Sequence, residues 1–191
     1  QNDLNLLDNI LKQGGYYFSK TETLVKKNDE NNSIDLDFLI ELGEKAKIRS
    51  IQFIGDKKIK DRKLRNVITS EENKFWKFIS RKKYLNPRQV DLDKRLLKNY
   101  YLDRGYYKVD VSDSSARLLD TGKFNLVFNI EAGSIYKINK TELILPDDYN
   151  PQNFAKVTKI LKKLENEKYS FTKLSKVVDQ IDKISLSREY E

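Results

Sequence analysis

Two short motifs recur in this sequence at one common spacing, and they constrain the fold more than any other feature. The tripeptide Gly-Tyr-Tyr at residues 15–17 appears again at residues 105–107, 90 residues later. The motif Ile-Glu-X-Gly ends at Gly43 and again at Gly133, which is the same spacing of 90 residues. Two independent motifs that share one spacing indicate a duplicated domain.

A helix is predicted directly before the second Gly-Tyr-Tyr. Apolar residues recur at helical spacing over residues 92–100, as on the buried face of an amphipathic helix. Asn86 followed by Pro87 is a typical N-cap and first helical residue, so we expect the helix to start near residue 87. Gly105, like Gly15 in the first copy, fits the position after a helix where a positive φ favours glycine.

After this glycine the apolar period changes from that of a helix to that of a strand. Tyr107, Val109 and Val111 alternate with polar neighbours and are predicted to face the core. A polar turn and a second alternating stretch at residues 124–130 predict the returning strand of an antiparallel hairpin. Residues 112–117 lose the alternation, as expected where an edge strand meets solvent or bulges.

The same order of elements describes the whole chain. One complete copy, read as strand, helix, helix, strand and strand, covers residues 46–133. A partial copy at residues 1–45 supplies a second helix and a hairpin, and a partial copy at 134–191 supplies a first strand and two helices. Gly133 is predicted as a structural turn at the junction. We therefore expect an α+β chain that is cut within a repeat at both ends, in keeping with its lack of methionine.

These features together resemble the POTRA domains of the BamA family of outer-membrane protein assembly factors. The resemblance is carried by the β-α-α-β-β order, the period near 90, the string YYLDRGY at residues 100–106 and the Ile-Glu-X-Gly junction. It implies tandem POTRA repeats, each with a three-stranded mixed sheet packed against two helices. Residues 46–133 look like the third POTRA domain, with the end of the second before it and most of the fourth after it. One departure is Glu189, which stands where the first two copies have glycine.

The resemblance also implies a function. It places the chain on the periplasmic side of the bacterial outer membrane, in an arm that precedes the membrane β-barrel of the parent chain. The implied partners are unfolded outer-membrane β-barrel proteins and accessory outer-membrane lipoproteins, bound by strand addition at a sheet edge. The expected edge residues are Tyr107, Lys108, Val109, Asp110, Val111 and Ser112. A POTRA arm of a related secretion or translocation transporter is the alternative within the fold.

The composition argues against catalysis. The chain has no histidine and no cysteine, which excludes a histidine-based triad, a thiol nucleophile and the common zinc sites. Carboxylate pairs such as Asp91 and Asp93 fit the start of a helix better than an acid-base pair. The glycines fall at turns and element ends rather than in a phosphate-binding loop. We expect no enzyme activity, no cofactor and no metal.

Two further features leave binding alternatives open. Residues 46–133 contain 21 Lys and Arg against 11 Asp and Glu, so a basic nucleic-acid-binding module or, more weakly, contact with anionic lipids is possible in principle. Nucleic acid is disfavoured because the nearby tyrosines already have roles in helix and strand. The aromatic residues Phe75, Trp76 and Phe78 form either a cap on the core or a contact patch for a neighbouring repeat or a lipoprotein.

Overall fold

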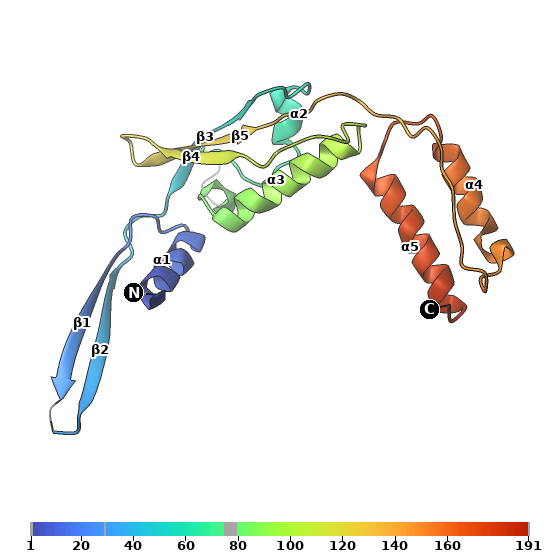
Figure 1. Cartoon of the computed structure of the whole chain (residues 1–191). Helices are drawn as coiled ribbons and strands as arrows, with labels where there is room; N and C mark the ends of the chain where they lie inside the picture. The colour runs from blue at the N-terminus through green and yellow to red at the C-terminus, as the bar shows by residue number, and fades with distance from the viewer. Residues whose placement is uncertain (1, 29, 75–79, 191) are drawn as a thin grey trace. The chain divides into compact units, whose positions relative to one another are not determined.

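The computed structural model describes residues 2–28, 30–74 and 80–190. Its elements, in chain order, are α1 (Asn2–Gln13), β1 (Lys20–Asn28), β2 (Ser33–Glu41), β3 (Lys47–Ile54), α2 (Asp61–Arg65), η1 (Arg81–Lys83), α3 (Pro87–Leu102), β4 (Ser114–Leu118), β5 (Lys123–Asn129), η2 (Pro151–Phe154), α4 (Ala155–Leu164) and α5 (Phe171–Ser187) (Figure 1). The chain divides into two compact units. The first unit consists of residues 1–53, 68–94 and 113–128, and the second unit of residues 54–67, 95–112 and 129–191.

A three-stranded sheet has the strand order β3-β5-β4, in which β4 and β5 are antiparallel. The Ile130 N–H donates to the Ile54 carbonyl at 3.0 Å. Two residues later, the Ala132 N–H donates to the Asp56 carbonyl at 3.0 Å. Because the residue numbers increase by two on both strands from one hydrogen bond to the next, β5 runs parallel to β3. The predicted α+β class with a mixed three-stranded sheet is therefore confirmed.

The first unit buries apolar side chains of β3 and β5. Ile48, Ile51 and Phe53 of β3 are buried, as are Leu126 and Phe128 of β5. The rings of Phe53 and Phe128 stack with their centroids 5.8 Å apart. Because each aromatic side chain removes a large apolar area from water, these two strands hold much of the hydrophobic stabilisation of this unit.

A buried carboxylate fixes a loop of the first unit to the second turn of α3. Asp93 is fully buried, and it accepts hydrogen bonds from the Thr69 N–H at 2.5 Å and the Thr69 hydroxyl at 2.7 Å. The Ser70 N–H donates to its other oxygen at 3.1 Å. Three donors offset the cost of burying an acid, so Asp93 has a structural role beyond the favourable charge at a helix start.

The second unit has its own apolar core. Its buried residues from α2, α3 and the segments after α3 and β5 are Leu64, Leu97, Tyr101, Leu102, Val109, Val111, Ile130 and Ala132. The Tyr101 hydroxyl donates to the Lys57 carbonyl, which holds the loop before α2 against α3. Burial raises the pKa of the Tyr101 phenol, so the hydroxyl keeps its proton and remains a donor.

The last copy packs as a helical pair in the second unit. Val157 and Leu164 of α4 and Val177 of α5 form a buried cluster. Ser170 is the N-cap of α5 and accepts a hydrogen bond from the Lys173 N–H at 3.2 Å. No helix among the described residues combines the length and the apolar character needed to cross a membrane.

The strand that was predicted directly after Gly133 is not observed. Residues 134–146 form no regular strand, and Lys137 makes only an isolated antiparallel bridge with Lys168. The alternation in this segment predicted an extended backbone, which it has, but a ladder also requires a neighbouring strand to satisfy its N–H and C=O groups. Within the described residues no strand supplies that ladder.

The exits of α1 and α3 have the same hydrogen-bond pattern. After α3, Gly105 has φ +94°, and the Tyr106 N–H donates to the Tyr101 carbonyl at 3.2 Å. After α1, Gly15 has φ +88°, and the next N–H donates to the carbonyl five residues back, that of Leu11, at 3.0 Å. Both are Schellman motifs, in which a left-handed residue satisfies the last carbonyls of a helix.

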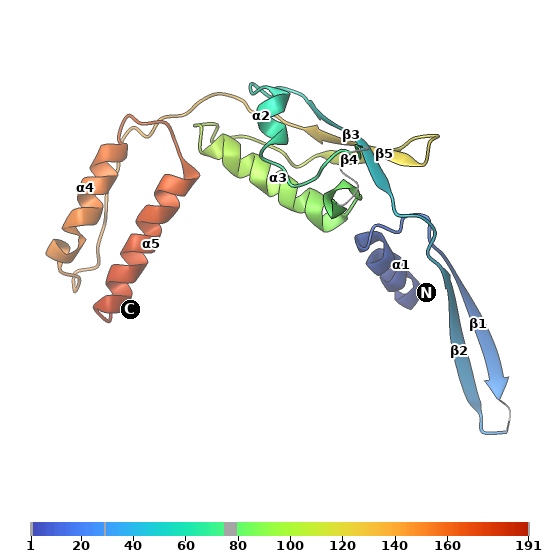
Figure 2. The same cartoon turned by 180° about the vertical axis from the view of Figure 1, so that it is seen from behind.

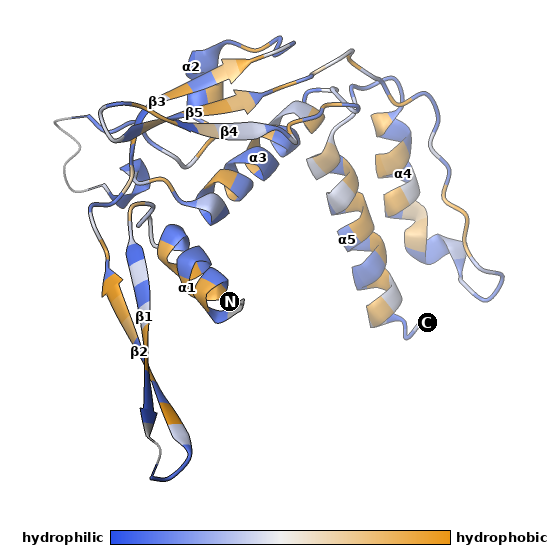
Figure 3. Ribbon diagram, turned by 60° about the vertical axis from the view of Figure 1, so that its left-hand side comes forward, coloured by the Kyte–Doolittle hydropathy of each residue, from blue (hydrophilic) through white to orange (hydrophobic). Residues whose placement is uncertain are grey.

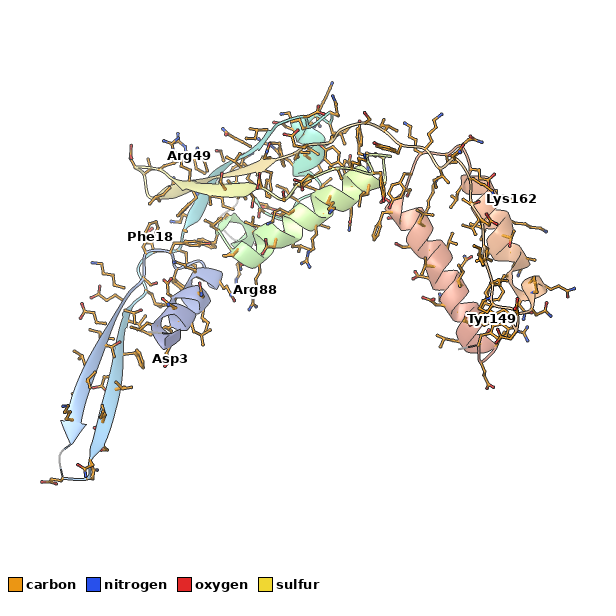
Figure 4. All side chains as sticks on the ribbon, in the orientation of Figure 1. Asp3, Phe18, Arg49, Arg88, Tyr149 and Lys162 are labelled. Carbon is orange, nitrogen blue, oxygen red and sulfur yellow. The ribbon has the colours of Figure 1, made fainter. Side chains whose placement is uncertain are left out.

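The exit of α5 repeats this pattern without a glycine. Glu189 has φ +54°, and the Tyr190 N–H donates to the Ser185 carbonyl at 3.0 Å. The Tyr190 ring stacks on Tyr149, labelled in Figure 4, with centroids 4.1 Å apart. A residue with a Cβ in the left-handed region carries a conformational cost of about 1 kcal/mol, which the surrounding contacts offset.

In both units, the glycine carbonyl of the cap binds the start of the next copy. In the first unit, Gly15 accepts from the Ala46 N–H at 2.8 Å, and Leu85 N–H donates to the Ala46 carbonyl at 2.9 Å; we call these residues the first joint. In the second unit, the second joint repeats both bonds. Gly105 accepts from the Tyr136 N–H at 2.7 Å, and the Tyr169 N–H donates to the Tyr136 carbonyl at 3.0 Å.

The hairpin of the first copy is a separate two-stranded sheet. β1 and β2 pair in an antiparallel register from Lys20 opposite Glu41 to Asn28 opposite Ser33. Figures 1 and 2 show the two strands side by side with no third strand next to them. Eight of the nine β2 residues are exposed, and much of β2 is coloured as hydrophobic in Figure 3.

Candidate peptide-binding edge

β4 is an edge strand whose outer side pairs with no strand among the described residues. Directly after β4, the Leu119 N–H donates to the Lys123 carbonyl at 2.9 Å. In an antiparallel pair every second residue repeats this inward bond, which assigns the inward positions to Ser115 and Arg117. The N–H and C=O groups of Ser114, Ala116 and Leu118 therefore point away from β5, toward the open edge.

The side chains of this outward row continue the apolar face of the sheet. Ala116 lies opposite Leu126 and Leu118 lies opposite Phe124. The two β5 side chains are buried, whereas Ala116 and Leu118 are exposed. An extended segment that paired with β4 would gain backbone hydrogen bonds and would place alternate side chains beside this apolar row.

The prediction that Tyr107 to Ser112 form the open edge is wrong, because the regular strand β4 begins only at Ser114, two residues after the end of the predicted edge. Residues 106–109 form a turn, in which the Val109 N–H donates to the Tyr106 carbonyl at 3.1 Å. Asp110 forms an isolated bridge with Glu131, with both backbone hydrogen bonds at 2.9 Å. The Asp110 N–H is thus used inside the sheet, where no incoming strand can reach it.

A β-bulge separates this bridge from β4. Asp110 lies opposite Glu131 and Ser114 lies opposite Phe128, so the outer strand has one residue more than its partner. The Asp110 carboxylate accepts from the Ser112 hydroxyl at 2.6 Å and from the Ser112 N–H at 3.0 Å. These hydrogen bonds from Ser112 hold the pKa of Asp110 below its ordinary value, and they stabilise the bulge.

The remaining residues of the predicted edge divide between core and surface. Val109 and Val111 are buried, but Tyr107 is 54% exposed rather than inward. Its ring lies 4.9 Å from that of Tyr169 and 6.0 Å from that of Tyr136. Lys108 lies over the Tyr136 ring at 5.7 Å. Tyr107 and Lys108 therefore contact the second joint, which the alternation of a single segment could not reveal.

The other predicted positions are placed as follows. Gly15 and Gly105 lie at the helix exits, and Gly133 has φ +66° with nothing within 4 Å of a Cβ built on it. Phe75, Trp76 and Phe78 lie outside the described residues. Across residues 2–28, 30–74 and 80–190, no three acidic side chains come close enough to hold a metal ion.

Comparison with known proteins identifies the repeat. Residues 46–133 match the family model described as POTRA, surface antigen variable number repeat. The outer membrane protein assembly factor BamA of Buchnera aphidicola is 26% identical over 160 residues, which is 83% of this chain and 25% of that protein. BamA of Neisseria meningitidis is 24% identical over 151 residues, 78% of this chain and 19% of that protein.

A solved structure shares the fold. The crystal structure of POTRA domains 3–5 of Haemophilus influenzae BamA aligns with a TM-score of 0.60 and 15% identity, covering 95% of this chain and 68% of that one. The chain spans a quarter or less of the length of the two BamA relatives. With the mixed sheet, the β-α-α-β-β order and the repeated joints, these matches show that residues 46–133 form a POTRA repeat, similar to those of the outer membrane protein assembly factor BamA.

Proposed function

We propose that this chain is part of a periplasmic arm in an outer-membrane β-barrel assembly machine, and that it binds extended segments by strand addition at β4. The partners we propose are unfolded outer-membrane β-barrel proteins and accessory outer-membrane lipoproteins. The relatives named above are outer membrane protein assembly factors, which supports a role of this kind. The arm would adjoin the membrane β-barrel of the parent chain and would have no catalytic part.

The observation that carries the proposal is the outward row of Ser114, Ala116 and Leu118. Backbone groups of an edge strand accept a partner strand of almost any sequence, as a receptor for many precursors requires. β4 has only five residues, and the bulge before it ends the regular pairing surface. We therefore expect weak and reversible binding, with little selectivity among side chains.

The test is a peptide titration that follows backbone amide signals by NMR. The probe is an extended peptide with the alternating apolar pattern of a membrane β-strand. In the unchanged chain we expect the largest shifts at residues 114–118. Ala116→Pro removes an outward N–H and places a ring at the edge, so it should abolish most of these shifts while the ladder to β5 persists.

Two controls make this result specific. Ala116→Thr keeps the outward N–H and should bind as the unchanged chain does, and circular dichroism should show that Ala116→Pro melts normally. Binding should also change little between low and moderate salt, whereas a basic nucleic-acid-binding module would show steep salt dependence. Unchanged peptide binding by Ala116→Pro would refute strand addition at β4.

A further inference from the structure

A groove in the second unit gathers positive charge from three separate segments. It has a volume of about 430 Å³, and its cationic lining residues are Lys58, Lys60, Lys63, Arg104 and Lys168. The three segments are residues 58–63, which comprise the end of the loop before α2 and the start of α2, the exit of α3, and the segment before α5. None of the described residues that line the groove is acidic.

Most of these cations form no ion pair with the described residues, although Arg104 lies close enough to Asp103 to help lower the pKa of that carboxyl. Lys58 pairs with Asp56, with Nζ and Oδ1 2.7 Å apart. Among the described residues, no ion pair involves the side chain of Lys60, Lys63 or Lys168, nor that of Arg104. Four like charges around one groove repel one another, and an anion bound between them would relieve this repulsion.

The groove is held in place on two sides. The Arg104 guanidinium lies 3.3 Å from the centroid of the Tyr100 ring, and its Nη1 donates to the Tyr100 carbonyl at 2.8 Å. These contacts fix the plane of the guanidinium and leave its other N–H groups for a ligand. In addition, the hydrogen bond from the Tyr101 hydroxyl to the Lys57 carbonyl holds the loop that carries Lys58 and Lys60.

The geometry points to a phosphoryl group as the ligand. A planar, fixed guanidinium is suited to two oxygens of one phosphate, and ammonium groups add unselective charge around it. We propose that this groove, which we call the phosphoryl groove, binds the phosphate of a lipid headgroup or of a small soluble phosphate ester. This proposal concerns a different surface from β4 and does not depend on strand addition.

The aromatic residues of the groove favour a headgroup or small ester over a nucleic acid. Arg104 covers the face of Tyr100, and the Tyr106 ring packs edge-on against Tyr101 with centroids 5.5 Å apart. The proteins that bind single strands rely on open aromatic faces on which bases stack. The two rings at this groove are engaged with other side chains.

The first experiment titrates the whole chain with inorganic pyrophosphate, followed by calorimetry and by NMR amide shifts. We expect shifts confined to residues 58–63, 100–106 and 168. The double variant Lys63→Gln, Arg104→Gln should weaken binding by roughly tenfold or more, as expected when charge-assisted hydrogen bonds are lost. Arg104→Lys keeps the charge but loses the fixed fork, so it should fall between the two.

The matched control removes the same charge elsewhere in the second unit. This control is the double variant Lys162→Gln, Lys163→Gln on α4, where Figure 4 labels Lys162. It should change the affinity for pyrophosphate by about twofold or less if binding is local. Equal losses in both double variants would show a diffuse charge effect and overturn the proposal. So would the absence of pyrophosphate binding to the unchanged chain.

A second experiment identifies the source of the phosphate. The chain is sedimented with vesicles of phosphatidylglycerol and, separately, of phosphatidylcholine. Sedimentation with the anionic vesicles alone, reversed by pyrophosphate and lost in the Lys63, Arg104 variant, would support a lipid headgroup. Pyrophosphate binding without vesicle binding would support a soluble ester. A single-stranded oligonucleotide that binds where pyrophosphate does not would overturn the proposal, because bases rather than phosphate would then drive recognition.

Discussion

β2 and β5 occupy equivalent places in two copies of the repeat, yet only one of them is buried. Ile34, Leu36, Phe38 and Ile40 correspond, at the spacing of 90 residues, to Phe124, Leu126, Phe128 and Ile130. In β2 these side chains are 61, 57, 44 and 39% exposed, and in β5 they are 7, 1, 0 and 0% exposed. The same apolar alternation therefore produces two strands in very different surroundings.

The difference lies in the neighbours of each strand. β5 is the central strand between β3 and β4, whereas β1 is the one strand of the described chain that pairs with β2. Phe128 stacks on Phe53 of β3, and Tyr17 and Phe18 pack on Phe124. Alternation determines that a segment is extended and which residues share a face, but burial depends on elements that lie elsewhere in the chain.

The largest effect that tests this comparison is expected from a pair of phenylalanine substitutions. Phe128→Ala removes a fully buried ring and should lower the free energy of unfolding by about 3–5 kcal/mol. Phe38→Ala acts on a half-exposed ring and should cost about 1 kcal/mol or less. Urea unfolding followed by circular dichroism measures both, and equal losses would break the comparison.

A second pair compares the two glycine caps. An alanine Cβ at Gly105 would meet Ile135 Cγ2 at 2.7 Å, whereas at Gly15 its nearest neighbour lies at 3.5 Å. Both variants carry the cost of a positive φ, about 1–2 kcal/mol, and Gly105→Ala adds a steric cost of about 1–3 kcal/mol. Unfolding of the two variants under identical conditions should rank Gly105→Ala as the more destabilised. The reverse order would contradict the close packing of the second joint.

The cap of α5 provides a prediction of opposite sign. Glu189→Gly relieves the left-handed conformation of a residue that has a Cβ, so it should stabilise the chain by about 1 kcal/mol or less. The thermal midpoint should rise slightly. Glu189→Ala is the control, because it removes the same charge and keeps the strained left-handed conformation. If its thermal midpoint rises as much as that of Glu189→Gly, the stabilisation comes from the loss of charge.

The smallest effect is expected at acid pH, and it concerns Asp103 at the second joint. Asp103 accepts hydrogen bonds from the Ser170 hydroxyl at 3.0 Å and from the Thr172 N–H at 2.8 Å. Burial opposes ionisation of this carboxyl, but the hydrogen bonds from Thr172 and Ser170 outweigh it and lower its pKa below the ordinary 3.8. The equivalent residue of the first joint is Gln13, which does not titrate.

A carboxyl whose pKa is lower in the folded state stabilises the fold above its unfolded pKa. The contribution of Asp103 is therefore present at neutral pH and is lost as the pH falls below about 3.8 through the folded-state value. Comparing the pH dependence of unfolding in the unchanged chain and in Asp103→Asn separates the contribution of Asp103 from those of Asp110 and Glu165, because hydrogen bonds lower the pKa values of these two carboxyls as well. Identical slopes in the two proteins would contradict a role for Asp103 in stability.

Sequence patterns predicted correctly those features of the fold that depend on residues near one another in the chain. The start of α3 at Pro87 follows from its cap, and the Asn86 side chain accepts from the Arg88 N–H at 2.9 Å. The repeat spacing predicted the equivalence of the two hairpins, and the polar run at residues 112–117 indicated a departure from regular alternation. The helix cap and the polar run depend only on residues close to the position concerned, whereas the repeat spacing is read by comparing two copies of the sequence.

The errors arose where distant segments decide the conformation. Tyr107 alternates with the valines that follow it, but contacts with Tyr136 and Tyr169 keep it at the surface. Residues 134–146 alternate as a strand does, but no ladder forms beside them among the described residues. The burial of Asp93 also depends on a loop more than 20 residues away, which no periodicity encodes.

The second joint has a mechanical consequence. A single residue, Gly105, both terminates α3 through its N–H, which donates to the Leu102 carbonyl, and binds the next copy through its C=O. Because the two bonds are in series along the backbone, a pulling force on Tyr136 is transmitted directly to the last turn of α3. Under such tension the helix would unravel from its C-terminal end before its buried residues are exposed, so the cap would act as the first element to yield.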